Sequence, residues 1–217
     1  MFPQLSGALG EVEDSPLVTI LEDTSDMGAF VIHHFISKAV KKGQKMLLVG
    51  LEQSFGHFHS VGLKLGFNLH KLREQKSILF YEGLKRVLEL GLNSSGPLSC
   101  VESSRNLNSL EELYKEVVAA ASSSQIVVVD NLSILHCLGH TPAAVFAFLH
   151  NLRLHLKPLG VALVVRLTNL ASDPAWVKTT KLATWRAGLT IEVEPLVTGQ
   201  SGISICHFPV FFRTTKN

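Results

Sequence analysis

Two carboxylates in this sequence stand where α/β proteins carry out chemistry on bound ligands. Asp130 follows the four β-branched residues 126–129, and Glu52 follows a second apolar run at 45–51. A run that is apolar at every position is typical of a strand buried on both faces, as in a parallel sheet. The carboxyl ends of such strands form the edge where α/β sheets bind ligands. An Asp there can hold the magnesium of a nucleotide, so a phosphate loop is expected upstream.

The loop that should supply the phosphate contacts departs from the pattern that phosphates require. That pattern is Gly, four residues, then Gly-Lys-Ser/Thr, between the first strand and the first helix. At the corresponding place, Asp23 replaces the first glycine, Gly28 keeps the second, Ala29 replaces the lysine and Phe30 replaces the hydroxyl residue. The loop therefore lacks both the cation and the magnesium ligand.

Negative charge near this loop adds to the mismatch. Glu22, Asp23 and Asp26 place three carboxylates where a triphosphate would sit, and like charges repel. We therefore expect a degenerate phosphate loop, no cofactor and no catalytic residue. Glu52 stands at the place of a catalytic carboxylate without the partners it needs, and we expect Asp130 to cap a turn or to pair at the sheet edge.

Other constellations carry less information. A zinc site needs four ligands, usually with closely spaced Cys and His pairs, and we predict no metal site from the scattered candidates His57, His59, His136, Cys137, His140, Cys206 and His207. No Gly-x-Ser-x-Gly nucleophile motif is present. Two basic groups could bind RNA with interleaved aromatics, although solvated helix ends would give the same composition. They comprise Lys38, Lys41, Lys42 and Lys45, and Lys64, Lys71, Arg73 and Lys76 near His57, Phe58 and His59.

The elements that must position these residues alternate between strands and helices. Apolar runs predict strands at 17–21, 45–51, 77–81, 125–130 and 160–165, and amphipathic stretches predict helices at 28–42, 54–65, 83–92, 107–121 and from 142 onward. After Asp173-Pro174 the sequence alternates between apolar and polar residues at 189–194 and 203–208, which predicts a half-exposed antiparallel hairpin at the sheet edge. The pattern as a whole predicts an α/β domain with a mostly parallel sheet.

Composition places the chain among intracellular globular proteins. It has 217 residues, a net charge of +2 and three cysteines far apart, which argues against a disulfide framework. The N-terminus shows no signal-peptide pattern, and no apolar run approaches the roughly 20 residues that cross a bilayer. We expect a cytoplasmic location, with the nucleus left open.

Several segments together resemble the sixth subunit of the Elongator complex. They are Phe30–Ile36, Gln53–His57, Val61–Gly66, Tyr81–Lys85 and Val129–Leu135, and the resemblance covers roughly residues 17–200. It implies a RecA-like, P-loop-type three-layer fold without ATPase motifs. It also implies a non-catalytic subunit that forms a hetero-hexameric ring with the fourth and fifth subunits, contacts the remaining Elongator subunits, binds tRNA through the ring and supports modification of the wobble uridine (U34).

The resemblance also suggests how the chain is organised. We expect a flexible arm at 1–15, a single RecA-like domain at 16–208 and a tail at 209–217 that is truncated or alternative. Two other functions stay open: an ATPase of the RecA class with an atypical phosphate loop, and another RecA-like Elongator ring subunit.

Overall fold

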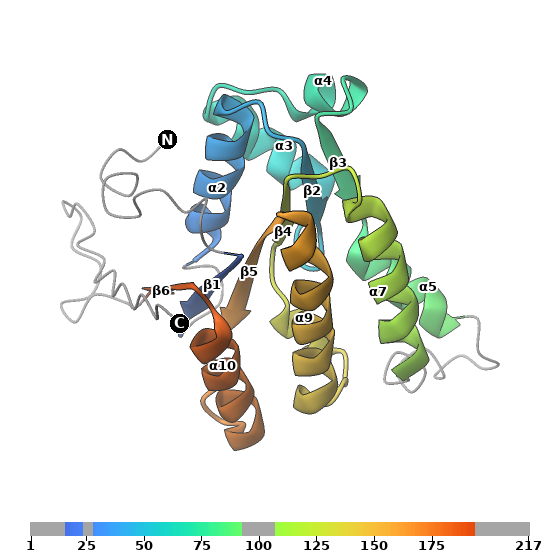
Figure 1. Cartoon of the computed structure of the whole chain (residues 1–217), viewed down its shortest axis with the longest axis vertical. Helices are drawn as coiled ribbons and strands as arrows, with labels where there is room; N and C mark the ends of the chain where they lie inside the picture. The colour runs from blue at the N-terminus through green and yellow to red at the C-terminus, as the bar shows by residue number, and fades with distance from the viewer. Residues whose placement is uncertain (1–15, 24–27, 93–106, 194–217) are drawn as a thin grey trace.

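A six-stranded sheet lies at the centre of the computed structural model, which describes residues 16–23, 28–92 and 107–193 (Figure 1). The strand order is β3-β2-β4-β5-β1-β6. The strands are β1 (Leu17–Glu22), β2 (Met46–Val49), β3 (Ile78–Tyr81), β4 (Ile126–Val129), β5 (Ala162–Thr168) and β6 (Leu189–Val193). Every described strand pair is parallel, which confirms the predicted α/β class and its parallel sheet.

Helices cover both faces of this sheet. They are α2 (Ala29–Lys41), α3 (Phe55–Lys64), α4 (Leu69–Glu74), α5 (Gly83–Leu92), α7 (Leu107–Ala121), α8 (Ser133–Cys137), α9 (Pro142–Leu156), the 3-10 turn η2 (Lys157–Leu159) and α10 (Pro174–Arg186). In Figure 1, α2 and α3 lie on one side of the sheet, and α7, α9 and α10 lie on the other. None of the described helices combines the length and apolarity needed to cross a membrane.

The alternation of side chains along each strand produces two separate cores. Leu47 and Val49 of β2 pack with α5, α7, α9 and α10, whereas Met46 and Leu48 of the same strand pack with α2 and α3. Both sets are buried because each strand of a parallel sheet has helices on both faces. The uninterrupted apolar runs of the sequence therefore correspond to central strands.

Side-chain caps fix the starts of several helices. Ser54 accepts a hydrogen bond from the N–H of His57 at the start of α3, and Thr141 accepts one from Ala144 at the start of α9, where Pro142 occupies the first turn. Such caps satisfy N–H groups that have no partner within the helix. These two starts lie within one residue of the predicted ones.

The last part of the described chain corrects one prediction. β6 is not half-exposed, because Thr190 is 7% exposed and Glu192 is half-buried between the buried Leu189, Ile191 and Val193. The strand pairs in parallel with β1 at the sheet edge. The reason is α10, a helix that the sequence patterns did not indicate and that returns the chain in the direction of β1. The second half of the expected hairpin, 203–208, lies outside the described residues, so the antiparallel hairpin stays a prediction.

Candidate functional site

A carboxylate fills the turn between β1 and α2, where a phosphate loop would hold its ligand. Glu22 is fully buried, and its Oε2 accepts a hydrogen bond of 2.5 Å from the N–H of Gly28. Helix N-termini present N–H groups that bind anions, and here the anion belongs to the chain itself. A Cβ at Gly28 would lie only 2.8 Å from Glu22 Oε2, so glycine permits this close approach.

Arg166 neutralises this carboxylate from the middle of the sheet. Its side chain is 1% exposed, and Nη1 lies 3.1 Å from Glu22 Oε1, while Nη2 contacts Glu52. Nε donates to the carbonyl oxygen of Asp130 at 2.7 Å. Thr168 donates a further hydrogen bond of 2.9 Å to Glu22 Oε1. A buried charge is tolerated only when it is paired and hydrogen-bonded, and this guanidinium has partners on all three of its nitrogens.

Asp130 uses both carboxylate oxygens to hold backbone N–H groups. Oδ1 accepts from Leu51 and Asn131, each at 2.7 Å. Oδ2 accepts from Glu52 at 3.0 Å and from Gln53 at 2.8 Å. A carboxylate offers about four lone-pair positions, so these four donors leave none directed at a metal ion. Burial raises the pKa of Asp130 to about 6, and the backbone donors act in the opposite direction.

The remaining residues of the loop position play structural parts. Asp23 is exposed, and its Oδ1 accepts a hydrogen bond of 3.1 Å from Asn169. Ala29 and Phe30 form the first turn of α2, and Phe30 packs against the core beneath that helix. Side chains that elsewhere would supply a cation and a hydroxyl are thus absent, and the aromatic ring of Phe30 contributes to packing.

Sequence reasoning missed Arg166, although a signal was present. It interrupts the apolar run of β5, a strand that extends to Thr168 and so carries the arginine past the predicted end at Val165. A lone arginine in a strand buried on both faces requires buried acids nearby. Glu22 and Glu52, both already noted in the sequence, are those acids.

The histidines considered as metal ligands are separated by the fold. No group of three potential metal ligands lies together among the described residues, and Cys206 and His207 lie outside them. His136 bridges two acceptors: Nδ1 lies 2.9 Å from the carbonyl oxygen of His140, and Nε2 lies 2.8 Å from Asp173 Oδ2. Its ring also stacks on Trp176. His136 therefore joins α8 to the start of α10.

Three other histidines are buried and uncharged. His33, His34 and His140 are each at most 7% exposed, and burial is the main cause that lowers the pKa of each to about 4. Desolvation disfavours the charged imidazolium. Two of the three, His33 and His34, are adjacent in α2, and both are buried.

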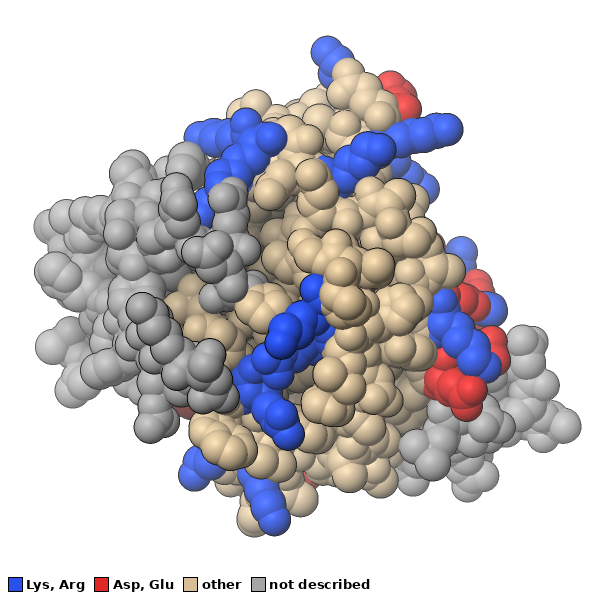
Figure 2. Space-filling model, in the orientation of Figure 1, with Lys and Arg blue, Asp and Glu red and all other residues tan. Residues whose placement is uncertain are grey.

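The basic groups of the sequence lie on α2, α3 and α4, which Figure 1 places at one end of the molecule. Figure 2 shows Lys and Arg side chains along the same end. Phe58 is only 2% exposed and cannot stack on a base, which corrects its inclusion among the interleaved aromatics. Phe55 instead lies below the guanidinium of Arg73, 5.1 Å from its ring centroid.

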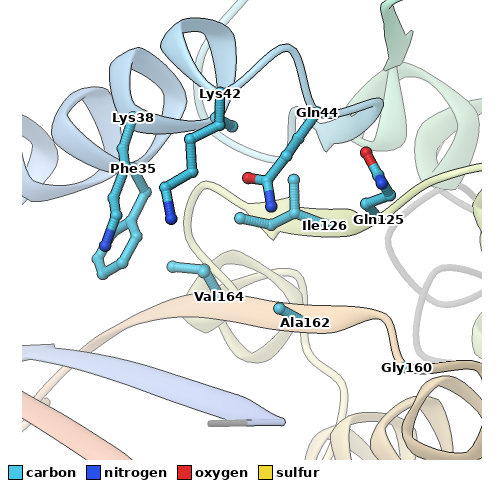
Figure 3. Close-up of a pocket in the computed structure, with 10 residues that line it drawn as sticks. Phe35, Lys38, Lys42, Gln44, Gln125, Ile126, Gly160, Ala162 and Val164 are labelled. Carbon is cyan, nitrogen blue, oxygen red and sulfur yellow. The ribbon is translucent and has the colours of Figure 1, made fainter. Parts of the chain in front are cut away.

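A pocket of about 280 Å³ opens between α2 and the amino ends of β4 and β5 (Figure 3). Ile126, Ala162 and Val164 line it with apolar atoms, and Lys38 and Lys42 extend toward it from α2. This chemistry suits a small anionic group on an apolar body. The pocket faces the amino ends of the strands, opposite to the edge where ligands of α/β sheets bind.

The comparisons with known proteins agree on one family. A family model described as Elongation complex protein 6 matches residues 2–213. The chain is 35% identical over 182 residues to Elongator complex protein 6 of Mus musculus, a match that covers 76% of this chain and 68% of that protein. It is 31% identical over 166 residues to the protein of the same name from Xenopus laevis, covering 70% and 63%. The Homo sapiens protein is 33% identical over 167 residues, covering 70% and 63%.

The chain thus spans about two thirds of the length of these relatives. The family model covers nearly all of the chain, from the residues before β1 to those after β6. This chain therefore belongs to the Elongation complex protein 6 family.

Proposed function

We propose that this chain is a non-catalytic subunit of the Elongator complex and acts through assembly with other subunits. Membership of a family whose relatives are named for that complex supports the proposal. The parallel sheet with helices on both faces agrees with a RecA-like fold over 16–208, although strand order and layers alone are shared by other α/β proteins. Within this proposal the chain works in the cytoplasm.

The observation that carries the non-catalytic part is the Glu22–Arg166–Glu52 cluster. It places a guanidinium and two carboxylates, paired with one another, between the end of β1, the start of α2 and the carboxyl ends of β2 and β5. A magnesium nucleotide would have to displace a buried carboxylate and leave Arg166 without its partner, which is costly. The residues present do not fit a magnesium nucleotide, and this argues against the ATPase alternative.

The assembly part follows from the resemblance. The chain joins the fourth and fifth Elongator subunits in a hetero-hexameric ring, contacts the remaining subunits through that ring and supports U34 modification by helping the ring to bind tRNA. Among the described residues, the exposed lysines of α3 and α4 supply charge suited to phosphate, for example Lys64 and Lys71. Aromatic stacking by Phe58 forms no part of this proposal.

Co-expression with the fourth and fifth subunits tests the assembly. We expect a particle that survives size-exclusion chromatography and whose mass, measured by native mass spectrometry, corresponds to two copies of each chain. A chain that stays monomeric beside both partners would contradict the ring. Formation of the particle with only one of the two partners would exclude the hetero-hexamer and retain the subunit role.

A further inference from the structure

The outer side of α9 and α10 carries cations that form no ion pair with any described residue. Arg153 lies on α9 and Arg186 on α10, two helices that pack against each other. Burial and then the charge of Arg186 lower the pKa of Arg153. Arg153 Nε is buried, and its N–H donates no hydrogen bond to any described residue. Neither arginine forms an ion pair with a described carboxylate.

The part of the sequence that contains both arginines has few acidic residues. Between Asp130 and Glu192, Asp173 is the only acidic residue, and it is already bound to His136 and to the first N–H groups of α10. The same stretch contains Arg153, Lys157, Arg166, Lys178, Lys181 and Arg186. Figure 2 shows Lys and Arg side chains over α9 and α10, whereas most of the visible Asp and Glu side chains lie on the side of α5 and α7.

Large apolar side chains accompany these cations. Trp185 of α10 is 68% exposed, and Leu182 on the same helix is exposed as well. Leu154 of α9 and Leu159 of η2 are each 55% exposed. α9 and α10 pack against each other, and the helices that carry these residues lie on the same face of the sheet (Figure 1). Trp and Arg are the residues most often responsible for affinity at protein interfaces.

We propose that this side of α9 and α10 is a docking surface for another protein chain, one that presents carboxylates beside apolar side chains. The unpaired guanidiniums of Arg153 and Arg186 specify the negative charge, and bidentate pairing with carboxylates would satisfy them. The exposed leucines favour a protein over a nucleic acid, because nucleic acids offer phosphates and bases and few aliphatic surfaces. This inference rests on the proposed function, since the partner is a neighbouring subunit of the assembly.

Charge reversal in the assembled complex tests the surface. We would prepare the complex with Arg153→Glu/Arg186→Glu in this chain and, separately, with Trp185→Ala. Trp185 and Arg186 are exposed and Arg153 is half-buried, so circular dichroism of the free chains checks that each variant keeps the wild-type fold. The proposal predicts that the double reversal raises the protein concentration at half-assembly by roughly tenfold or more, with a smaller rise for Trp185→Ala.

A matched variant and a second readout separate the possible outcomes. Lys85→Glu/Lys115→Glu makes the same change in charge at two exposed lysines of α5 and α7 and should leave assembly unchanged. If the wild type does not assemble, the proposed function fails. If the wild type assembles and the Arg153→Glu/Arg186→Glu complex forms equally well, the docking surface is wrong. Intact assembly with weakened binding of a tRNA transcript would overturn protein docking in favour of nucleic acid.

Discussion

The carboxyl edge of the sheet and the outer side of α9 and α10 differ in whether their arginines are paired with acidic residues. At the edge, Arg166 is 1% exposed and contacts both Glu22 and Glu52. On the outer side, Arg153 and Arg186 lie near each other without an acid. In the first region the charged side chains are paired within the chain, whereas in the second we propose that they pair with another molecule.

This difference indicates where the chain can act. A site that binds a ligand needs donors and acceptors free to meet it, and the edge where α/β sheets usually bind ligands has few, since Asp130 and Glu22 are saturated by the chain's own donors. Under the proposed function, the chain therefore acts through its outer surfaces and not through this edge. The predictions below test whether the closed edge and the open surface differ as described.

The largest effect should come from Arg166→Met. This substitution removes the cation between Glu22 and Glu52 and leaves a buried carboxylate unpaired, so we expect a loss of about 3–5 kcal/mol in the free energy of unfolding. Urea denaturation followed by circular dichroism measures it. The matched change Arg186→Met, on the open surface, should cost less than about 0.5 kcal/mol. Equal effects of the two substitutions would remove the distinction between the regions.

A smaller loss is expected for Asp130→Asn. The amide keeps one acceptor oxygen and turns an NH₂ group toward two backbone N–H donors, which become unsatisfied. At roughly 1–2 kcal/mol for each of the two lost partners, the lower part of the cost of an unsatisfied buried group, the free energy of unfolding should fall by about 2–4 kcal/mol in the same urea measurement. Asp23→Asn, an exposed neighbour at the same edge, provides the control and should be nearly neutral. A stable Asp130→Asn protein would show that the capping of the β2–α3 turn is dispensable.

Acid should lower the free energy of unfolding because three buried histidines must become protonated. His33, His34 and His140 have folded-state pKa values lowered to about 4 from 6.5, so the unfolded chain binds more protons between these values. Stability is therefore full above about pH 6.5 and falls as the pH drops toward 4. Asp130, with a pKa raised to about 6, acts in the opposite direction from pH 6 downward, but it is one group against three.

Urea midpoints measured at several pH values between 7.5 and 4.5 check this dependence. His140→Leu should flatten the slope, because that histidine is buried and neither ring nitrogen has a partner among the described residues. Stability that rose on acidification would contradict the assignment of these three histidines as neutral and buried.

The smallest effect should come from Asp173, which caps the start of α10. Asp173 caps α10 by accepting hydrogen bonds from Ala175 and Trp176, and it also binds His136. The first-turn N–H groups and His136 hold the pKa of this carboxyl below its usual range. Asp173→Ala should lower the thermal midpoint modestly, and Asp173→Asn should lower it less because the amide oxygen still caps the helix. If the alanine variant is unchanged in a thermal melt, the cap does not stabilise α10.

Much of this fold was predictable because its strands are buried on both faces. Runs such as 126–129 are apolar at every position, and α7 and α9 bury apolar residues at helical spacing, as at Leu113 and Val117 and at Val145, Leu149 and Leu152. α10 escaped prediction because it buries Thr179 and Thr180 rather than large aliphatic residues, although Asp173-Pro174 is a helix-start signal. Because α10 was missed, the parallel pairing of β6 with β1 was missed as well.

The candidate site was predictable in its position and not in its chemistry. The sequence shows that Ala29 and Phe30 lack the functional groups of a phosphate loop. It does not show that Glu22 turns inward to the N–H of Gly28, since this depends on Arg166, a residue 144 positions away in the chain. Long-range pairing of this kind is set by the register of β1 against β5, in which Ile20 lies beside Arg166.

The central claim is tested most directly by titrating the purified chain with magnesium ATP in an isothermal calorimeter. Because the β1–α2 turn is filled by Glu22 and Arg166, we predict no saturable heat up to millimolar nucleotide, with the wild-type urea midpoint unchanged by the ligand. A saturable isotherm with one nucleotide per chain, together with a rise in the urea midpoint, would contradict the account and show that this edge opens to bind a ligand.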